Sequence, residues 1–189
     1  MSDYITTYRG THFYPANPEA DKIHIEDIAH ALSLVCRGNG HVKIFFSVGE
    51  HCIRCAKEAQ ARGYSAKVSL ACLLHDASEI YMSDVPSPFK KLLPEYQERE
   101  ERLLNMIFRK FLGTELEVWE TELVKQVDKD MLYYDLRELL GEVSQDKEPE
   151  MKTVFTYQER NFREVEKEYL DLYEELQLEL QRQKPGGNL

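Results

Sequence analysis

Apolar residues recur every three to four positions along most of this chain, which is the pattern of helices with one buried face. In the segment 26–36, for example, Ile28, Leu32 and Val35 fall on one side of such a helix. The pattern contains no internal repeat and no strands alternating with helices, so a parallel sheet is not expected. The sequence therefore predicts an all-α protein, a single helical bundle that forms one domain.

Capping residues divide this pattern into elements. Ser47 and Glu50 have the spacing of a capping box, Ser65 is suited to cap the following helix, and Thr156 with Glu159 repeats the capping-box spacing near the C-terminus. Glycines and prolines mark the breaks between these segments. The helices are expected at residues 26–36, 48–62, 65–80, 94–113, 117–140 and 156–182.

The two ends of the chain differ from the helical middle. Residues 1–25 mix aromatic residues with two prolines and are expected to be irregular, with at most a short strand. Residues 26–141 form the expected helical core, 156–183 a C-terminal helix with a charged face, and 184–189 a disordered tail. One domain of 189 residues is large enough to bury a substantial core.

Charge and hydropathy argue against a nucleic-acid-binding, membrane-spanning or secreted protein. The formal net charge is −10, and such a surface repels a phosphate backbone, so no nucleic-acid partner is expected. A small phosphorylated substrate stays open, because a local arginine or a metal ion can outweigh the overall field. No apolar run approaches the roughly 20 residues of a membrane span, and the N-terminus lacks the apolar stretch of a secretory signal. We expect a cytoplasmic protein whose four cysteines are reduced, small and buried.

The chemistry of the sequence gathers in the stretch LACLLHDASEIYMSDVPSPF, residues 70–89. An apolar helix there ends in His75 and Asp76, and two further acids follow, Glu79 and Asp84. On a continuous helix Glu79 lies one turn beyond His75 and Asp76, on the same face. Charged groups next to apolar residues need a cation or a hydrogen-bond network, and a mixed nitrogen and oxygen set suits a divalent transition metal. A polar helix terminus without a metal is the plainer alternative.

Two other segments strengthen the metal interpretation. His51 stands in the first turn of the helix predicted at 48–62. Asp128 lies inside an apolar stripe with Val124 and Val127, whereas Asp130 is expected on the solvent side. An acid inside a buried stripe needs a partner, and a metal ion is a natural one.

The order His51, His75-Asp76, Asp128 resembles the H…HD…D signature of the HD-domain metal-dependent phosphohydrolases. The segment 75–84 is similar to the HD-x-x-E and G-D motifs of bacterial 5′-deoxynucleotidases, with Ser83 in place of the glycine. The stretches DIAHALSLVCRGNGH and FFSVGEHC resemble a subgroup common in phages and prophages, which includes dATP triphosphohydrolases. This chain departs from the subgroup's pattern at two positions: Gly38 stands where the pattern has Phe, and Phe46 stands where it has Tyr. The resemblance covers roughly residues 4–140.

The resemblance implies an HD-domain bundle with one divalent transition metal ion (Co, Mn, Zn, Ni or Fe) between helices. The ligands it implies are His51, His75, Asp76 and Asp128. It also implies that Arg37, whose planar fork suits a phosphate, acts on the substrate. Glu79 and Asp84 are the catalytic acid and base candidates, without an assignment of which is which. His41 and Lys43 are further candidates for substrate contacts.

The function expected from the resemblance is hydrolysis of a deoxynucleotide, as a 5′-deoxynucleotidase that converts a nucleoside monophosphate to nucleoside and phosphate. One alternative is a dNTP triphosphohydrolase of the dATP type, for which Lys43, Lys90 and Lys91 could supply positive charge near the outer phosphates. Another is an HD module that binds a nucleotide without turnover. A two-iron oxygenase is less favoured, because only His41 remains as a spare ligand. A homo-oligomer is expected from the family, with the C-terminal helix as a candidate contact.

Overall fold

The computed structural model describes residues 3–183 and is mostly helical, which confirms the predicted all-α class. The elements in chain order are β1 (Ile5–Thr6), β2 (His12–Phe13), a 3₁₀ turn η1 (Ala20–Lys22), α1 (Ile25–Leu34), a second turn η2 (Arg37–Gly40), α2 (Val48–Ala61), α3 (Ala66–Leu74), α4 (Glu79–Met82), α5 (Ser87–Lys90), α6 (Pro94–Leu112), α7 (Val118–Asp135), a π-helical turn η3 (Leu136–Leu140) and α8 (Phe162–Arg182). The expected tail at 184–189 lies outside the described residues.

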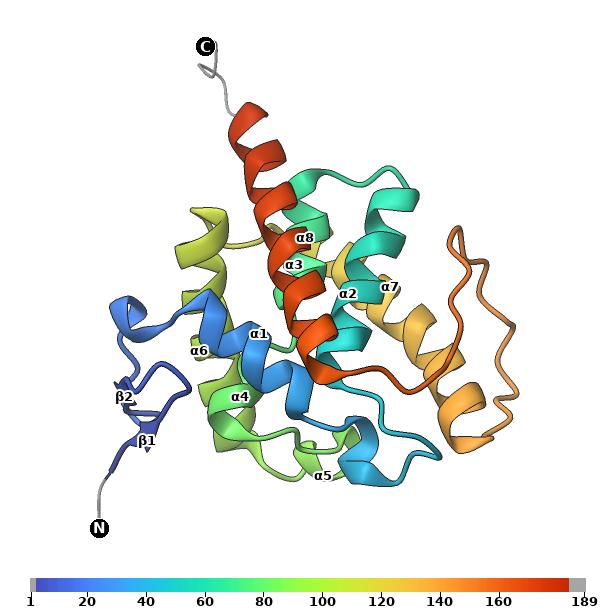
Figure 1. Ribbon diagram of the computed structural model, residues 1–189, viewed down its shortest axis with the longest axis horizontal. Helices are drawn as coiled ribbons and strands as arrows, with labels where there is room; N and C mark the ends of the chain where they lie inside the picture. Colours follow the sequence, from blue (N-terminus) through green and yellow to red (C-terminus); the bar gives the residue numbers. More distant parts are fainter. Residues whose placement is uncertain (1–2, 184–189) are drawn as a thin grey trace.

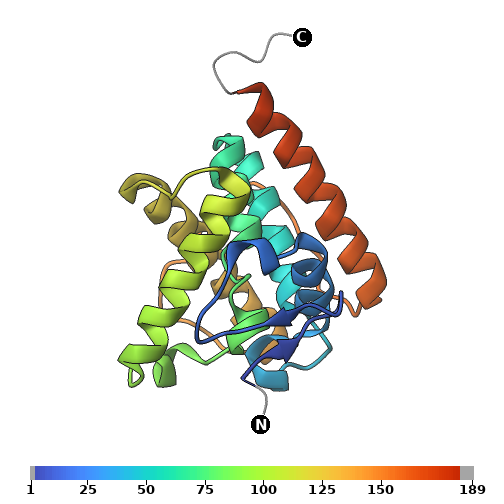
Figure 2. The ribbon, with the colours of Figure 1, turned by 90° about the vertical axis from the view of Figure 1, so that its left-hand side faces the viewer.

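Helices α2 and α3 form the centre of the bundle. They pack against each other, α7 contacts both, and α1 and α8 cover them from another side. Figure 1 shows α8 crossing in front of α3 and α2, and Figure 2 shows the same helix lying along one face of the molecule. The apolar stripe of α8, which includes Tyr169, Leu172 and Leu176, is buried against this body. That stripe is therefore already covered within one chain.

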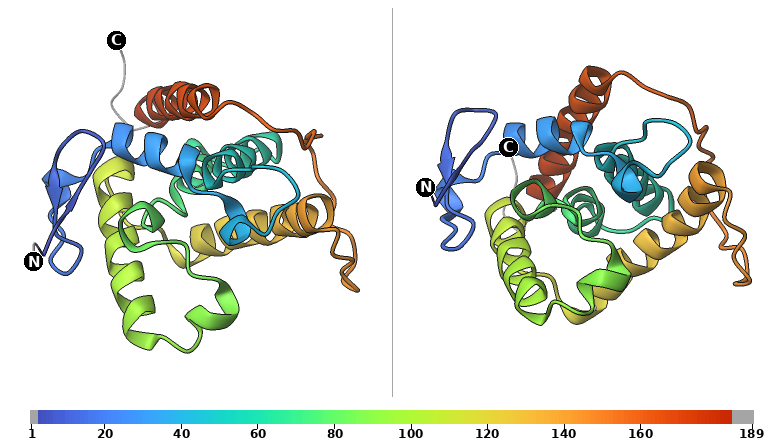
Figure 3. Two further views of the ribbon diagram at one scale, coloured as in Figure 1. Left: turned by 60° about the horizontal axis from the view of Figure 1, so that its bottom comes forward. Right: turned by 90° about the horizontal axis from the view of Figure 1, so that it is seen from below.

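Two non-helical segments lie at opposite ends of the molecule. Strands β1 and β2 form a small antiparallel hairpin, with Ile5 opposite Phe13, where the sequence predicts at most one short strand. The segment 141–161 lies at the other end, beside α7 (Figure 3). Among the described residues, no helix combines the length and the hydropathy that crossing a membrane requires.

The predicted caps of the central helices are confirmed. The Ser47 side chain accepts a hydrogen bond from the Glu50 amide, and the Glu50 carboxylate accepts one from the Ser47 amide, which completes the capping box of α2. Ser65 caps α3 through the amide of Val68. These caps fix where α2 and α3 begin, and hence where His51 and His75 stand.

The helix predicted over 65–80 is wrong in its second half, because α3 ends at Leu74. The Nδ1 of His75 donates a hydrogen bond to the carbonyl of Cys72, 2.7 Å away, which a continuing helix would pair with the amide of Asp76. The chain then turns through tighter bonds, such as that from the Glu79 amide to the Asp76 carbonyl, before α4 begins. The break is what allows the adjacent side chains of His75 and Asp76 to approach one another.

The C-terminal helix begins at Phe162 rather than at the predicted residue 156, with Asn161 as its cap. The segment before it is extended, so Phe155 and Tyr157 face the same side and both contact the guanidinium of Arg54. The carbonyl of Thr156 accepts a hydrogen bond from Arg54 at 2.8 Å. A helix starting at Thr156 would lose these contacts, so tertiary packing overrides the local capping signal.

Glu58 ties this extended segment to α2. Its buried carboxylate accepts hydrogen bonds from Arg62 at 2.7 Å and from the backbone amides of Lys152 and Thr153 at 2.9 and 3.0 Å. Although burial alone would raise the pKa of Glu58, these donors lower it below its ordinary value.

We therefore expect Glu58→Gln to lower the free energy of unfolding by about 2 kcal/mol, the scale of hydrogen bonds to a charged group. Because the folded-state pKa is lowered, the wild-type advantage is present above the unfolded pKa of about 4.3 and is lost as the pH falls through the folded value. Urea unfolding of both proteins across that pH range measures this. Glu122→Gln, which removes an exposed partner of Lys125 on α7, is the control and should change little.

Candidate metal centre

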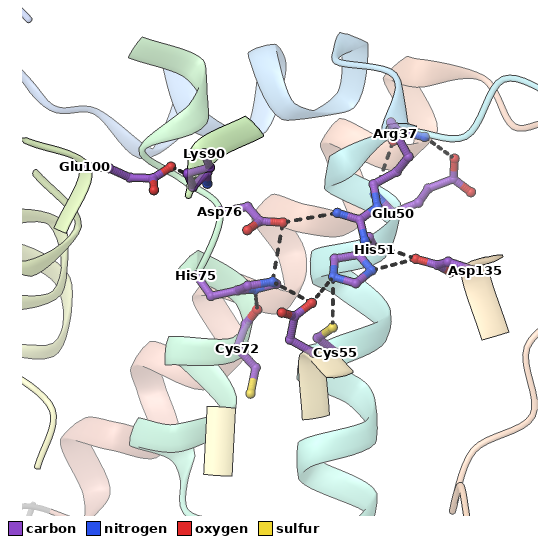
Figure 4. A network of polar contacts seen from close by, with 12 residues as sticks. Arg37, Glu50, His51, Cys55, Cys72, His75, Asp76, Lys90, Glu100 and Asp135 are labelled. Atoms are coloured by element: carbon purple, nitrogen blue, oxygen red, sulfur yellow. Dashed lines mark hydrogen bonds and ion pairs between the residues drawn. The ribbon is translucent and has the colours of Figure 1, made fainter. Parts of the chain in front are cut away.

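The four predicted metal ligands meet at the centre of the bundle. His51 comes from the first turn of α2, His75 and Asp76 from the end of α3, and Asp128 from the middle of α7. The Nε2 of His51 lies 3.0 Å from Oδ1 of Asp128, and the Nε2 of His75 lies 3.6 Å from the same oxygen. Asp76 Oδ2 is 3.3 Å from the Nε2 of His75 (Figure 4). The cluster joins three helices, as the sequence predicts.

Both imidazole rings turn an Nε2 atom toward this point because their Nδ1 atoms are engaged elsewhere. His75 donates from Nδ1 to the Cys72 carbonyl, and His51 donates from Nδ1 to Oδ2 of Asp135 at 2.8 Å. Within the described residues, the buried Nε2 of His75 makes no hydrogen bond. Two inward nitrogens beside a carboxylate oxygen need a shared cation or proton. The donor set of the cluster therefore fits a metal ion.

The titration behaviour of Asp128 agrees with this electrostatic picture. Burial would raise the pKa of its carboxyl, but the hydrogen bond to His51 and the charge of the His75 ring nearby hold the pKa well below the usual range. The carboxylate is thus anionic and directed at the two rings. The buried cluster of His, Cys and Asp side chains could hold a metal ion.

Asp135 is a functional residue that the sequence reasoning missed. Its buried carboxylate accepts from His51 at Nδ1 and from the hydroxyl of Tyr157 at 2.8 Å, and it lies 3.4 Å from Arg37. A carboxylate behind a ligand histidine fixes the tautomer and the orientation of the ring. The signal was available, since Asp135 stands seven residues, or two helical turns, after Asp128.

Asp130 also differs from the expectation, because it is buried rather than solvent-facing. Its carboxylate pairs with Arg62 at 2.8 Å, next to Glu58, and so belongs to the contact between α2 and α7. The apolar spacing of α7 does not reveal this partner, which comes from another helix.

Arg37 lies at the edge of the cluster, in the turn η2 that follows α1. Its guanidinium is 3.5 Å from Oδ2 of Asp76 and 3.4 Å from Oδ2 of Asp135, and only 15% of its side chain is exposed. Arg37 thus reaches the cluster, although it does not line the cavity beside it. Its two carboxylate contacts are long, so the fork retains donors for an anion.

Glu79 and Asp84 lie near Asp76, whose charge raises the proton affinity of both. Burial, followed by repulsion from Asp76 and Asp84, raises the pKa of Glu79 to about 9. One carboxylate oxygen of Glu79 is buried and has no hydrogen-bond partner in the described part of the chain. Burial also raises the pKa of Asp84, against an opposing effect of Arg37.

Ser83, which directly precedes Asp84, adopts a backbone conformation that normally belongs to glycine, with φ 74° and ψ 150°. Its carbonyl accepts a hydrogen bond from the hydroxyl of Tyr96 at 2.7 Å, which helps to hold this geometry. Strain of this kind costs on the order of 1–3 kcal/mol per residue.

Ser83→Gly should therefore raise the free energy of unfolding by about 1 kcal/mol. Glycine relieves the backbone strain of the folded state, and its greater conformational freedom in the unfolded chain offsets part of that gain. Thermal or urea unfolding of the purified variant measures the gain. Ser87→Gly, in the helical backbone of α5, is the matched control and should not stabilise. A destabilised Ser83→Gly protein would show that the serine side chain contributes more than its backbone costs.

A cavity of about 530 Å³ opens beside the cluster, between the segment 75–90 and helices α6 and α7. His75 and Asp76 line it together with Lys90, Glu100 and Lys125. Its volume lies in the range of small-molecule sites. Two larger cavities, about 680 and 640 Å³, flank the segment 141–160 and contain none of the predicted site residues, so the smaller one is the relevant pocket.

The two predicted substrate-contacting residues His41 and Lys43 are not brought to the cluster. Both are exposed, and Lys43 lies beside Gly141 at the end of η3, where its amide bonds the Leu139 carbonyl. Lys90 and Lys125 are the lysines that line the cavity, where Lys90 pairs with Glu100 at 2.8 Å. The turn at Gly38 and Asn39, both with positive φ, carries His41 outward.

The sequence predicts that all four cysteines are buried, and the structure confirms this for three of them. Cys52, Cys55 and Cys72 are buried, but Cys36 is only half-buried. The Sγ of Cys55 lies 3.5 Å from the Nε2 of His51, inside the cluster that the sequence reasoning built from His and Asp alone. The spacing signal was present, since Cys55 follows His51 by four residues on α2 and shares its face.

No family model matches the chain. It is 38% identical over 108 residues to the uncharacterized protein YfdR of Escherichia coli, a match that covers 57% of this chain and 58% of that protein. It is 37% identical over 101 residues to the uncharacterized protein RCAP_rcc00048 of Rhodobacter capsulatus, with 50% of this chain and 51% of that protein covered. These matches span only a little more than half the length of either relative, and neither name states an activity.

Proposed function

We propose that the chain is a metal-dependent phosphohydrolase of the HD type that acts on deoxynucleotides. The observation that carries the proposal is the convergence of His51, His75 and Asp128 from three helices, with Asp76 at 3.3 Å from His75. Arg37 contacts Asp76, and a cavity of about 530 Å³ opens beside His75 and Asp76. A satisfied polar core would not leave the buried Nε2 of His75 without a hydrogen bond.

The metal ligands in this proposal are the two Nε2 atoms and the carboxylates of Asp76 and Asp128. A divalent ion bound there would act as a Lewis acid toward a phosphoryl oxygen and would acidify a water molecule. Asp135 holds the ring of His51 in the orientation that ligation requires, through the bond to Nδ1.

The remaining charged groups bind the phosphate and transfer protons. Arg37 binds the phosphate through its guanidinium and stabilises the charge that develops on it. Glu79, whose carboxyl pKa is raised by burial, suits the donor of a proton to the leaving 5′-oxygen, and Asp84 suits the acceptor of a proton from the attacking water. This division of the acid and base roles is part of the proposal.

The preferred substrate is a nucleoside 5′-monophosphate, because its single phosphate group requires no positive charge from the protein beyond that of Arg37. A dNTP triphosphohydrolase is the second candidate, because Lys90 and Lys125 in the cavity wall could contact outer phosphates. The acids in that wall, including Glu100 and Glu101, oppose the binding of the roughly two additional negative charges that a dNTP carries beyond a monophosphate. Assembly into a homo-oligomer remains part of the proposal and would use a surface other than the covered stripe of α8.

The test is product release from all dNMPs and dNTPs in the presence of Mn, Co or Zn. We expect orthophosphate from monophosphates with the wild type, none with Asp76→Ala, and normal activity with Asp146→Ala, an exposed acid in the 141–150 segment. Triphosphate from one dNTP would favour the second candidate. Nucleotide binding without product, in a protein that holds its metal, would indicate a binding module instead.

A further inference from the structure

We infer that Cys55 is a ligand of the same ion, as a thiolate, and that it makes the centre selective for zinc over manganese. The inference rests on the metal site of the proposed function but not on its nucleotide substrate. His51, Cys55, His75 and Asp128 each offer one ligand atom, and these four atoms lie within 4.8 Å of one another.

The separations agree with a shared ion. From bond lengths of about 2.3 Å to sulfur and about 2.05 Å to nitrogen, a tetrahedral zinc ion places the two ligand atoms about 3.5 Å apart. The Sγ of Cys55 is 3.5 Å from the Nε2 of His51. The carboxylate oxygen of Asp128 is 3.0 and 3.6 Å from the two imidazole nitrogens, which is also the range for atoms on one small ion.

The position of the thiol in the site supports the same conclusion. Cys55 is one helical turn after His51 on α2, so both side chains project from one face toward α3 and α7. Figure 4 shows the sulfur of Cys55 directed at the ring of His51, while the sulfur of Cys72 points away from the cluster. A ring nitrogen of His75 lies within 4.8 Å of the same thiol; the thiol of Cys52 also lies within 4.8 Å of His75 and of Asp76, but it is not grouped with His51 and Asp128.

The thiol changes which metal the site prefers. Oxygen ligands and imidazole accept manganese and zinc alike, whereas a soft thiolate favours zinc and disfavours manganese. Imidazole, carboxylate and thiolate are all ligand types that zinc takes, and Asp76, whose Oδ2 lies 3.3 Å from the Nε2 of His75, can join the four as a fifth ligand. Cys55 therefore narrows the choice of metal that His and Asp alone leave open.

The experiment uses cobalt as a spectroscopic probe for zinc in the full-length protein. Cobalt is titrated into metal-free wild type, Cys55→Ser and Cys72→Ser, and the sulfur-to-cobalt charge-transfer band in the near ultraviolet is recorded. We expect the band in wild type and Cys72→Ser but not in Cys55→Ser. Mutation of a residue that only hydrogen-bonds to a metal ligand typically lowers metal affinity about 10- to 100-fold. Loss of the ligand itself in Cys55→Ser should therefore lower zinc affinity at least about tenfold, while manganese affinity changes less.

The outcomes separate the inference from the proposed function. Cobalt bound by wild type without a charge-transfer band would overturn the thiolate ligand and leave the metal centre intact. A band that survives in Cys55→Ser would assign the sulfur to another cysteine and also overturn the inference. Failure of wild type to bind cobalt or zinc at all would overturn both. Circular dichroism of each variant establishes that it is folded, and the wild-type spectrum alone can reject the inference.

Discussion

Asp128→Asn should abolish both metal binding and phosphohydrolase activity while leaving the helical content unchanged. Asp128 is the carboxylate that both imidazoles approach, at 3.0 and 3.6 Å, and this proximity lowers its pKa. Mutation of a residue that hydrogen-bonds to a metal ligand typically lowers metal affinity or activity about 10- to 100-fold. Loss of Asp128, a ligand itself, should therefore lower both by more than about 100-fold.

The measurements are metal content after dialysis and the initial rate on the best dNMP, each compared with wild type. Glu122→Gln on the same helix is the control, since its exposed side chain pairs with the exposed Lys125. Full activity in Asp128→Asn would remove the basis for the metal centre. Loss of activity with metal retained would instead place Asp128 among the catalytic groups rather than the ligands.

Local sequence signals located the elements that carry the site. The capping box at Ser47 and the cap at Ser65 act within one turn, so their partners are close in sequence and the starts of α2 and α3 could be predicted. Asp128 could be found because an acid among apolar residues at helical spacing implies a buried partner. These inferences require no knowledge of how the helices pack.

The errors arise where a tertiary contact competes with a local preference. The helix through His75 was expected to continue, but the His75 ring takes the Cys72 carbonyl and the helix ends. The capping signal at Thr156 is overridden because Arg54 binds the extended segment around Phe155 and Tyr157. Both outcomes depend on side chains whose orientation is set by the fold.

Asp135 and Cys55 were missed for a related reason. Each stands at helical spacing from a predicted ligand, Asp135 two turns after Asp128 and Cys55 one turn after His51. Spacing shows that two residues share a helix face, but only the packing of α2 against α7 shows that these faces meet. A carboxylate behind a histidine and a thiol beside it therefore became visible only in the folded chain.

Removal of the metal should destabilise the whole fold, because the cluster joins α2, α3 and α7. Without a cation, Asp76 and Asp128 lie close to the two imidazoles, and burial followed by repulsion from Asp76 and Asp84 raises the pKa of Glu79 beside them. An ion at 1,000 times its dissociation constant stabilises the folded state by about 4 kcal/mol. For a chain of this size that corresponds to a rise in Tm of about 8–16 °C.

Thermal unfolding with added zinc or with a chelator measures this shift, and two variants identify its origin. Asp128→Asn should show almost no metal-dependent shift, because its ion does not bind. Glu79→Gln should keep the shift and lose catalysis, since Glu79 is placed to transfer a proton rather than to hold the ion. A wild-type Tm that is the same with zinc and with chelator would contradict a metal that bridges three helices, and a shift retained in Asp128→Asn would place the bound ion elsewhere in the protein.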